Sequence, residues 1–165
     1  MNNNHIGTTF AIMKEIADDL GWNYSHGQLT EMGMKSIQVY PMLHVTIQSV
    51  SMVDSIATIQ INVVIADIMN FLKGENESDV LRTTYDKYGY SESQNYAHIL
   101  QNLYVAFSRQ LFAKEQQYFA QIQFQRPISF APFIEGDGDV LSGHNITLNM
   151  DVINPWVTDG DCYGD

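Results

Sequence analysis

Hydrophobic and polar residues along the chain follow two different periods, and the helical period occurs twice. Apolar side chains recur every three or four positions up to Leu20, with Thr8 or Thr9 as a cap, which predicts a short amphipathic helix. A longer helix is predicted from near Ser91, where Ser-x-x-Gln matches a capping box, to about Ala113. The apolar positions of the longer helix are Tyr96, Ile99, Leu100, Leu103, Phe107 and Leu111.

A period of two predicts β-strands between and after these helices. Leu43, Val45 and Ile47 alternate with polar residues, and a second alternating run follows a break at 53–55. Two such runs joined by a short polar turn predict a β-hairpin. The inward positions of the second run are Ala57, Ile59, Ile61, Val63 and Ile65. Alternation returns near the end of the chain, at Tyr118, Ala120, Ile122 and Phe124 and at Ile146, Leu148, Met150 and Val152.

The order helix, strands, helix, strands predicts an α+β fold in a single domain that spans residues 1–165. Strands joined by short turns favour an antiparallel β-sheet, which two amphipathic helices cover on one face. Three segments lack a regular pattern. We interpret 22–41 as an extended arm or loop, 70–90 as a connection and 154–165 as a C-terminal tail.

Composition limits the classes of function. The chain has 165 residues, 45% of them apolar, which is enough for a core without disulfides or metals. Eight basic and nineteen acidic residues give a net charge of −11, which disfavours a nucleic-acid-gripping role because phosphate contacts need Lys or Arg. A single cysteine, Cys162, favours a reducing compartment. Because neither a secretion signal nor an apolar run of about 20 residues is visible, we expect a soluble, intracellular protein without membrane contact.

The stretch "EGDGD" is the main candidate for metal chemistry, since it places Glu135, Asp137 and Asp139 within five residues. Clustered carboxylates suit Ca²⁺ or Mg²⁺, but the continuation "VLSGHN" supplies none of the further ligands that a calcium-binding loop needs. Glycines between acids also suit a solvent-exposed turn. We favour that interpretation and expect neither a metal nor a cofactor.

Other catalytic motifs are not found. No two of the five histidines have the i, i+4 spacing of a helical metal site. Cys162 has no base near it in the sequence, and nucleophile-elbow, phosphate-loop and dinucleotide fingerprints are missing. We therefore expect a protein that is not an enzyme. A metal-dependent enzyme that uses 135–139 together with His144 is the weakest alternative.

Two segments outside the predicted core favour contacts with other proteins. The stretch "TTYDKYGY" at 83–90 is rich in tyrosine, which is favoured at protein interfaces. The tail 154–165 has no periodicity and combines an aromatic residue with acids, which favours packing on a partner. The residues concerned are Tyr85, Tyr88, Tyr90, Trp156, Asp159 and Asp161.

Three stretches, together with the order of elements, carry a resemblance to a known family. They are "YPMLHVTI" at 40–47, "INVVIADIMN" at 61–70 before the long helix, and "FAPFIEGDGDVLSGHNITLNMDV" at 130–152. The sequence resembles the small ring-forming neck proteins of tailed bacteriophages, in the tail terminator, tail-completion or head–tail connector group. It is similar to neck proteins of phages that infect Bacteroidetes-type hosts.

This resemblance implies a virion structural protein, assembled in the host cytoplasm, that forms a homo-oligomeric ring, a hexamer or a dodecamer. Such a ring joins the portal or connector to the tail and contacts other neck, portal or tail proteins, while DNA passes through without specific binding. The resemblance adds Tyr40 and Pro41, at the entry to the hairpin, to the interface candidates. Residues 117–165 carry seven acids and one base, and acids that faced the lumen would repel phosphate. The candidates for the subunit interface or the lumen are then Tyr40, Pro41, Tyr85, Tyr88, Tyr90, Glu135, Asp137, Asp139, Trp156, Asp159 and Asp161.

One further class of function stays open. A charge of −11 on a small α+β domain also fits an acidic inhibitor, such as an immunity protein or a DNA mimic that blocks a basic enzyme. That protein would be a stable monomer, whereas the neck protein would form rings. The symmetry of the ring, the choice between a terminator and an adaptor, the host and the neighbouring proteins all stay open.

Overall fold

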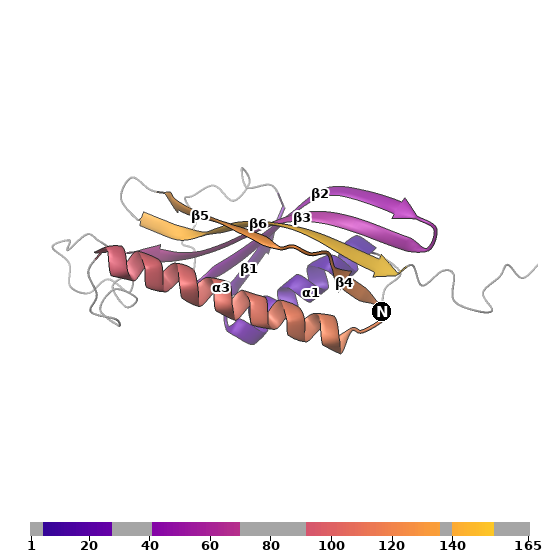
Figure 1. Ribbon diagram of the computed structural model, residues 1–165, viewed down its shortest axis with the longest axis horizontal. Coiled ribbons are helices and arrows are strands. Elements are labelled where there is room, and N and C mark those ends of the chain that lie inside the picture. The colour runs from indigo at the N-terminus through magenta and orange to yellow at the C-terminus, as the bar shows by residue number, and fades with distance from the viewer. Residues whose placement is uncertain (1–4, 28–40, 70–91, 136–139, 154–165) are drawn as a thin grey trace, which may run out of the picture.

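The computed structural model describes residues 5–27, 41–69, 92–135 and 140–153, which form eight elements (Figure 1). In chain order these are α1 (His5–Leu20), β1 (Asn23–His26), β2 (Met42–Val53), β3 (Ile56–Met69), α3 (Glu92–Gln117), β4 (Ile122–Phe124), β5 (Ser129–Glu135) and β6 (Val140–Ile153).

The strands form one six-stranded sheet in the order β1-β2-β3-β6-β4, with β5 also paired to β6. The predicted α+β fold is confirmed, but the sheet is mixed because β1 pairs with β2 in parallel. The strand Asn23–His26 lies in the segment 22–41, which the sequence pattern assigned to an arm or loop. It lacks apolar alternation, and its burial is only partial. Parallel neighbours need a long connection, and residues 27–41 between the two strands are long enough to make it.

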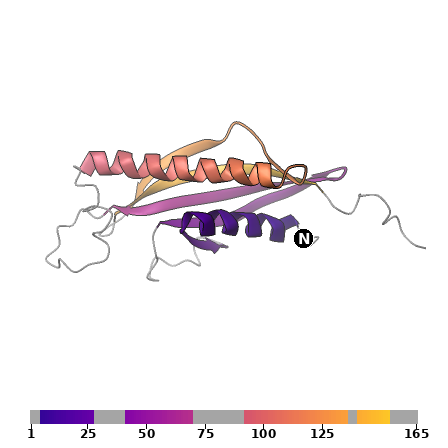
Figure 2. The same ribbon diagram turned by 90° about the horizontal axis from the view of Figure 1, so that it is seen from below.

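Both described helices lie on one face of the sheet, as predicted, and Figure 2 shows them side by side in front of the strands. The inward residues of β3 are all fully buried, and those of β6 are buried beside them. Each fully buried aliphatic side chain stabilises the fold by about 1.5–3 kcal/mol. The helices contribute Ile12, Met13, Ile16 and Ala17 from α1, and Ile99, Leu103, Phe107 and Leu111 from α3.

The predicted hairpin is confirmed. Strands β2 and β3 pair in antiparallel register up to Val53 and Ile56, with a two-residue turn between them. Asp54 in this turn has φ 53°, a left-handed conformation that Asp tolerates better than most residues. A register shift between Ile47 and Ser49 places one extra residue in β2.

The segment after α3 differs from the prediction. The helix continues to Gln117, and the strand predicted over 118–124 is reduced to Ile122–Phe124. The amides of Gln121 and Ile122 both donate to the carbonyl of Tyr118, which closes a turn where alternation had predicted a strand. The apolar residues at 118 and 120 are therefore not part of a strand.

An ionic cluster fixes α1 against α3. The ammonium group of Lys114 is nearly buried and lies 3.1 Å from an oxygen of Glu15 and 2.9 Å from one of Asp19. The Tyr118 hydroxyl donates to the Glu15 carboxylate at 2.8 Å. Burial disfavours the charged lysine, but the bonds to Asp19 and Glu15 outweigh it and raise the pKa of Lys114 above its usual value.

Replacing Lys114 with Met should lower the free energy of unfolding by about 1–2 kcal/mol, because two neighbouring carboxylates lose their shared cation. Urea denaturation measures this loss. The matched control is Lys14→Met, which breaks the exposed pair with Asp18 and should cost less than about 0.5 kcal/mol. Equal losses in the two variants would contradict a special role for the buried lysine.

Replacing Gly143 with Ala should destabilise the fold by about 3 kcal/mol, because the strands cannot separate without breaking the sheet. A Cβ atom at this position would lie 2.0 Å from the carbonyl oxygen of Ile65 in β3. The control is Gly21→Ala, where φ is +70° and the surroundings are open, so only backbone strain of about 1 kcal/mol is added. A smaller loss in Gly143→Ala than in Gly21→Ala, measured by thermal denaturation, would contradict this.

Candidate interaction surface

Only two of the residues predicted for the interface or lumen lie in the part of the chain that the structure describes. Pro41 is half-buried directly before β2, and its carbonyl accepts a 2.9 Å hydrogen bond from the amide of Asn23. Glu135 is the last residue of β5 and is paired with Leu141 of β6. The predicted residues outside the described ranges are Tyr40, Tyr85, Tyr88, Tyr90, Asp137, Asp139, Trp156, Asp159 and Asp161.

The acidic loop "EGDGD" therefore starts at the end of a β-hairpin. Strands β5 and β6 are antiparallel neighbours from Ser129 and Thr147 to Glu135 and Leu141, and the loop joins them. The prediction that ordinary sheet flanks this loop on both sides is confirmed.

The tip of the β2–β3 hairpin exposes apolar residues that the pattern did not single out. Figure 1 shows this hairpin running past the ends of both helices. Val50 and Met52 pair with inward residues of β3, so they lie on the helix side of the sheet but beyond the helices. Val53, which is 72% exposed, and Ile56 pair on the opposite face. The tip is thus apolar on both faces, a feature that is typical of contact surfaces. We call these four residues the hairpin tip.

The outer edge of β2 is open along the same stretch. Strand β1 pairs only with Met42–Val45, so within the described ranges residues 46–53 have no strand on that side. The stretch "TIQSVSMV" contains neither a charge nor a proline. An unprotected apolar edge is a template for pairing with another chain.

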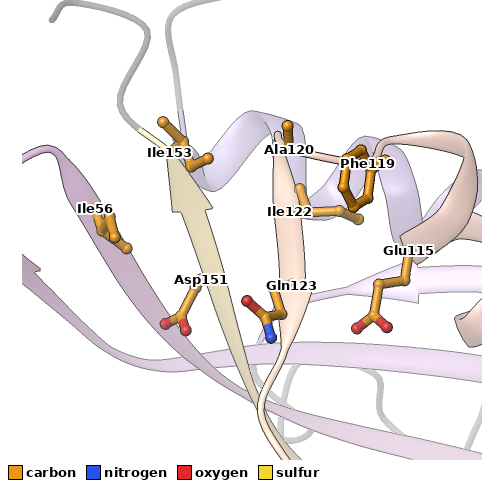
Figure 3. Close-up of a pocket in the computed structure, with 8 residues that line it drawn as sticks. All are labelled: Ile56, Glu115, Phe119, Ala120, Ile122, Gln123, Asp151 and Ile153. Carbon is orange, nitrogen blue, oxygen red and sulfur yellow. The ribbon is translucent and has the colours of Figure 1, made fainter.

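A depression of about 310 Å³ lies at this end of the molecule (Figure 3). Its apolar side is formed by the ends of β3, β4 and β6 and by the turn after α3, whereas carboxylate and amide groups form the other side. Phe119 in the turn is 84% exposed, the largest exposed fraction among the described large apolar residues. The lining residues are Ile56, Glu115, Phe119, Ala120, Ile122, Gln123, Asp151 and Ile153.

The two acids beside this depression are held by local partners. Glu115 accepts a 2.9 Å hydrogen bond from Arg126 and a 2.8 Å bond from the amide of Phe124. Burial opposes the charge of Glu115, but these two donors prevail and lower its pKa. Asp151 accepts a 2.6 Å hydrogen bond from the hydroxyl of Thr58. Both carboxylates are therefore acceptors in fixed positions.

The centre of the sheet face opposite the helices is polar and carries few charges. Its central residues alternate with the buried ones of β3 and β6 and are amides and hydroxyls, and no described strand contains Lys or Arg. Such a face offers hydrogen bonds but no cation for phosphate. The residues are Thr58, Gln60, Asn62, Asn145, Thr147 and Asn149.

A buried histidine joins β1 to β2. His44 Nε2 lies 2.9 Å from the Gly27 carbonyl, which only accepts, so Nε2 carries the proton. The other ring nitrogen, Nδ1, then accepts from the Ser25 hydroxyl at 2.9 Å. A serine–histidine pair also occurs in nucleophilic catalysis, where the second nitrogen likewise donates to an orienting group but the base faces an open site. Here the His44 side chain is buried, so the pair holds the short strand in place.

Within the described part of the chain, no group of three or more His, Cys, Asp or Glu side chains is arranged to hold a metal ion. Neither described helix is sufficiently long and apolar to cross a lipid bilayer.

A sequence signal for the hairpin tip existed. Met52 and Val53 are adjacent, so in a strand they point to opposite faces, and only one of these faces has helices over it. Consecutive apolar residues beside a two-residue turn, which point to both faces of the hairpin, therefore indicate an exposed apolar tip. Phe119 had no comparable signal, because alternation placed it on the polar face of a predicted strand.

Comparison with known proteins adds no relative: no family model matches the chain, and no curated protein matches it.

The buried His44 should make stability depend on pH. Burial, and to a smaller extent the nearby His26, lower the pKa of His44, against the opposing bond to Gly27. The unfolded chain then binds a proton at about pH 6.5 that the folded chain does not. The contribution of His44 to the free energy of unfolding is therefore fully present above about pH 6.5 and is lost as the pH falls below that value. The His44→Gln variant should lose less folding stability between pH 7 and pH 5 than the wild type does. Thermal melts at each pH measure this difference. An unchanged profile in His44→Gln would contradict the assignment.

Proposed function

We propose that this chain is a structural subunit of a homo-oligomeric ring at the neck of a tailed bacteriophage, either a tail terminator or a head–tail connector. The ring is a hexamer or dodecamer that joins the portal or connector to the tail. It belongs to the virion, is assembled in the host cytoplasm and carries out no catalysis.

The observation that carries this proposal is the hairpin tip. Four apolar residues are exposed on both faces of an arm that extends beyond the helices. Exposure of this kind is unfavourable for a chain that works alone and is suited to insertion against another subunit. The resemblance of 40–47, 61–70 and 130–152 to neck proteins points to the same class of assembly.

The charge distribution supports passage of DNA without specific binding. Residues 117–165 have a large excess of acids, and the centre of the sheet face opposite the helices presents amides and hydroxyls. Either surface, turned to the lumen, leaves a DNA duplex mobile, because neither offers Lys or Arg to displace counterions.

An acidic inhibitor is supported less well. A DNA mimic needs free carboxylates spaced like phosphates, whereas the acids on the two described helices are largely occupied within the subunit. Glu15 and Asp19 bind Lys114, Asp18 binds Lys14, and Glu115 binds Arg126. The net charge of −11 is the only observation that favours this class.

The proposal predicts rings. Native mass spectrometry and electron microscopy of the purified full chain should show hexamers or dodecamers. Val53→Asp combined with Ile56→Asp should reduce the assembly to monomers without lowering the melting temperature, because both side chains are exposed. Each buried charge opposes association by several kcal/mol.

The matched control is Ile134→Asp, which places a charge at another exposed apolar residue, on β5. Rings should persist in this variant. A wild-type chain that stays monomeric at all concentrations, or a virion reconstruction with these subunits away from the neck and tail end, would contradict the proposal.

A further inference from the structure

The outer edge of β2 beside the hairpin turn is accessible on both faces of the sheet. All side chains from residue 48 to residue 53 are exposed, and no described strand lies along them (Figure 1). The register shift between Ile47 and Ser49 interrupts this edge, because an extra residue bends the strand. The regular stretch that can accept a further strand is therefore 49–53.

Two residues of this stretch direct their backbone groups away from the sheet. A two-residue hairpin turn is closed by hydrogen bonding between the residues on either side of it, here Val53 and Ile56. Along an antiparallel strand, successive residues then bond alternately towards the neighbouring strand and away from it. The N–H and C=O groups of Val50 and Met52 therefore point to the open side, where no described strand pairs with them.

The opposite edge of the sheet is closed at β4. The amide of Phe124 donates to the Glu115 carboxylate at 2.8 Å, and its carbonyl accepts from Arg126 at 3.3 Å. The amide of Ile122 donates to the carbonyl of Tyr118 at 3.2 Å. Farther along the same side, β5 contains a proline. Two copies of the chain therefore lack the free groups to join β2 of one to β4 of the other, whereas two β2 edges can join each other.

We propose that two copies of the chain pair β2 with β2 in antiparallel orientation, across a two-fold axis that passes beside Ser51. Val50 of each copy then lies opposite Met52 of the other, and each of these two pairs exchanges both backbone hydrogen bonds. The outward groups are placed symmetrically about Ser51. This is the register in which both residues find their counterparts in the second copy.

The side chains agree with this register. Val50 and Met52 are 45% and 54% exposed, on the helix side of the sheet but beyond the helices. In the paired form they become cross-strand neighbours of the same residues in the second copy, which removes apolar surface from water. On the other face, Ser51 meets Ser51 of the second copy, and Ser49 meets Val53 of the second copy.

The charge pattern favours a second copy as the occupant. A net charge of −11 opposes close approach of two copies over most of their surface. The stretch 46–53 contains no charged residue, so no acids face each other along the paired strands. Asp54, directly after this stretch, lies opposite Gln48 of the second copy in the proposed register. A partner attracted by its basic charge would find no acid to bind along 46–53.

The strand pairing goes beyond the proposed function and does not need it. A two-fold contact joins two copies and is then complete, so a hexamer or dodecamer requires another contact in addition. Val53→Asp, one of the substitutions in the ring test, lies within the paired stretch. That double variant therefore removes this contact as well.

Disulfide trapping on the full chain tests the register. In Ser51→Cys combined with Cys162→Ser, the remaining thiol lies at the two-fold axis. The two Cα atoms are then about 4.5 Å apart, a separation that a disulfide can bridge. Mild oxidation should give a covalent dimer on a gel run without reductant.

The matched control is Ser49→Cys combined with Cys162→Ser, two residues away on the same face of the same strand. In the proposed register the two copies of residue 49 are about 13 Å apart along the strands, too far for a disulfide. This variant should give little covalent dimer. Equal cross-linking in the two variants, or none in Ser51→Cys, would overturn the proposal.

Charge substitution tests the two-fold symmetry without oxidation. Ser51→Asp places two carboxylates directly opposite each other, and Ser51→Lys places two ammonium groups there, so each variant alone should lose the dimer in sedimentation velocity. An equimolar mixture of the two should restore it, which separates loss of the contact from loss of folding. A mixture that stays monomeric would overturn the proposal.

The outcomes also separate this pairing from the ring. Rings that form without the Ser51→Cys cross-link would overturn the strand pairing and leave the ring proposal in place. Cross-linked dimers in a chain that forms no ring would uphold the strand pairing and contradict the ring.

Discussion

The pairing of β3 with β6 is the constraint on which the rest of the structure depends. The two strands are in register from Ile56 and Ile153 to Met69 and Val140, without a bulge. Every second residue of the pair faces the helices, and these residues form the centre of the core. Gly143 shows how close the contact is, since no side chain fits between it and the Ile65 carbonyl. Strands β2, β4 and β5 are placed by pairing with this central pair, and the helices by packing on it.

The exposed apolar end follows from the lengths of these strands. Strands β3 and β6 each have fourteen residues, and both run beyond the part of the sheet that α1 and α3 cover. Val50 and Met52 of β2 pair with inward residues of β3 at this end, so they continue the core face beyond the helices and are exposed. Ile56 and Ile153 are exposed cross-strand neighbours on the opposite face, and Val53 extends that row across the hairpin turn. Only the apolar residues on the helix side of the tip are therefore a continuation of the core pattern.

The sequence was informative wherever local periodicity and burial agree. The hairpin, the inward face of β3 and the two amphipathic helices all have one apolar face, so their period alone predicts them. Strand β1 could not be predicted, because Asn23–His26 acquire their structure from hydrogen bonds to β2, with His44 and Ser25 joining the two. Lys114 was also hidden, since its partners Glu15 and Asp19 lie about a hundred residues away. Of the predicted interface residues, the structure describes only the positions of Pro41 and Glu135, so the resemblance to neck proteins stays a prediction.

The two edges of the sheet are protected unequally, and this bears on how copies associate. Strand β5 contains Pro132, which has no amide hydrogen to donate, and it ends in the acidic stretch that begins at Glu135. The β2 edge over residues 46–53 has no such protection. Among the described strands, the β2 edge is therefore less protected against pairing with another strand than the β5 edge.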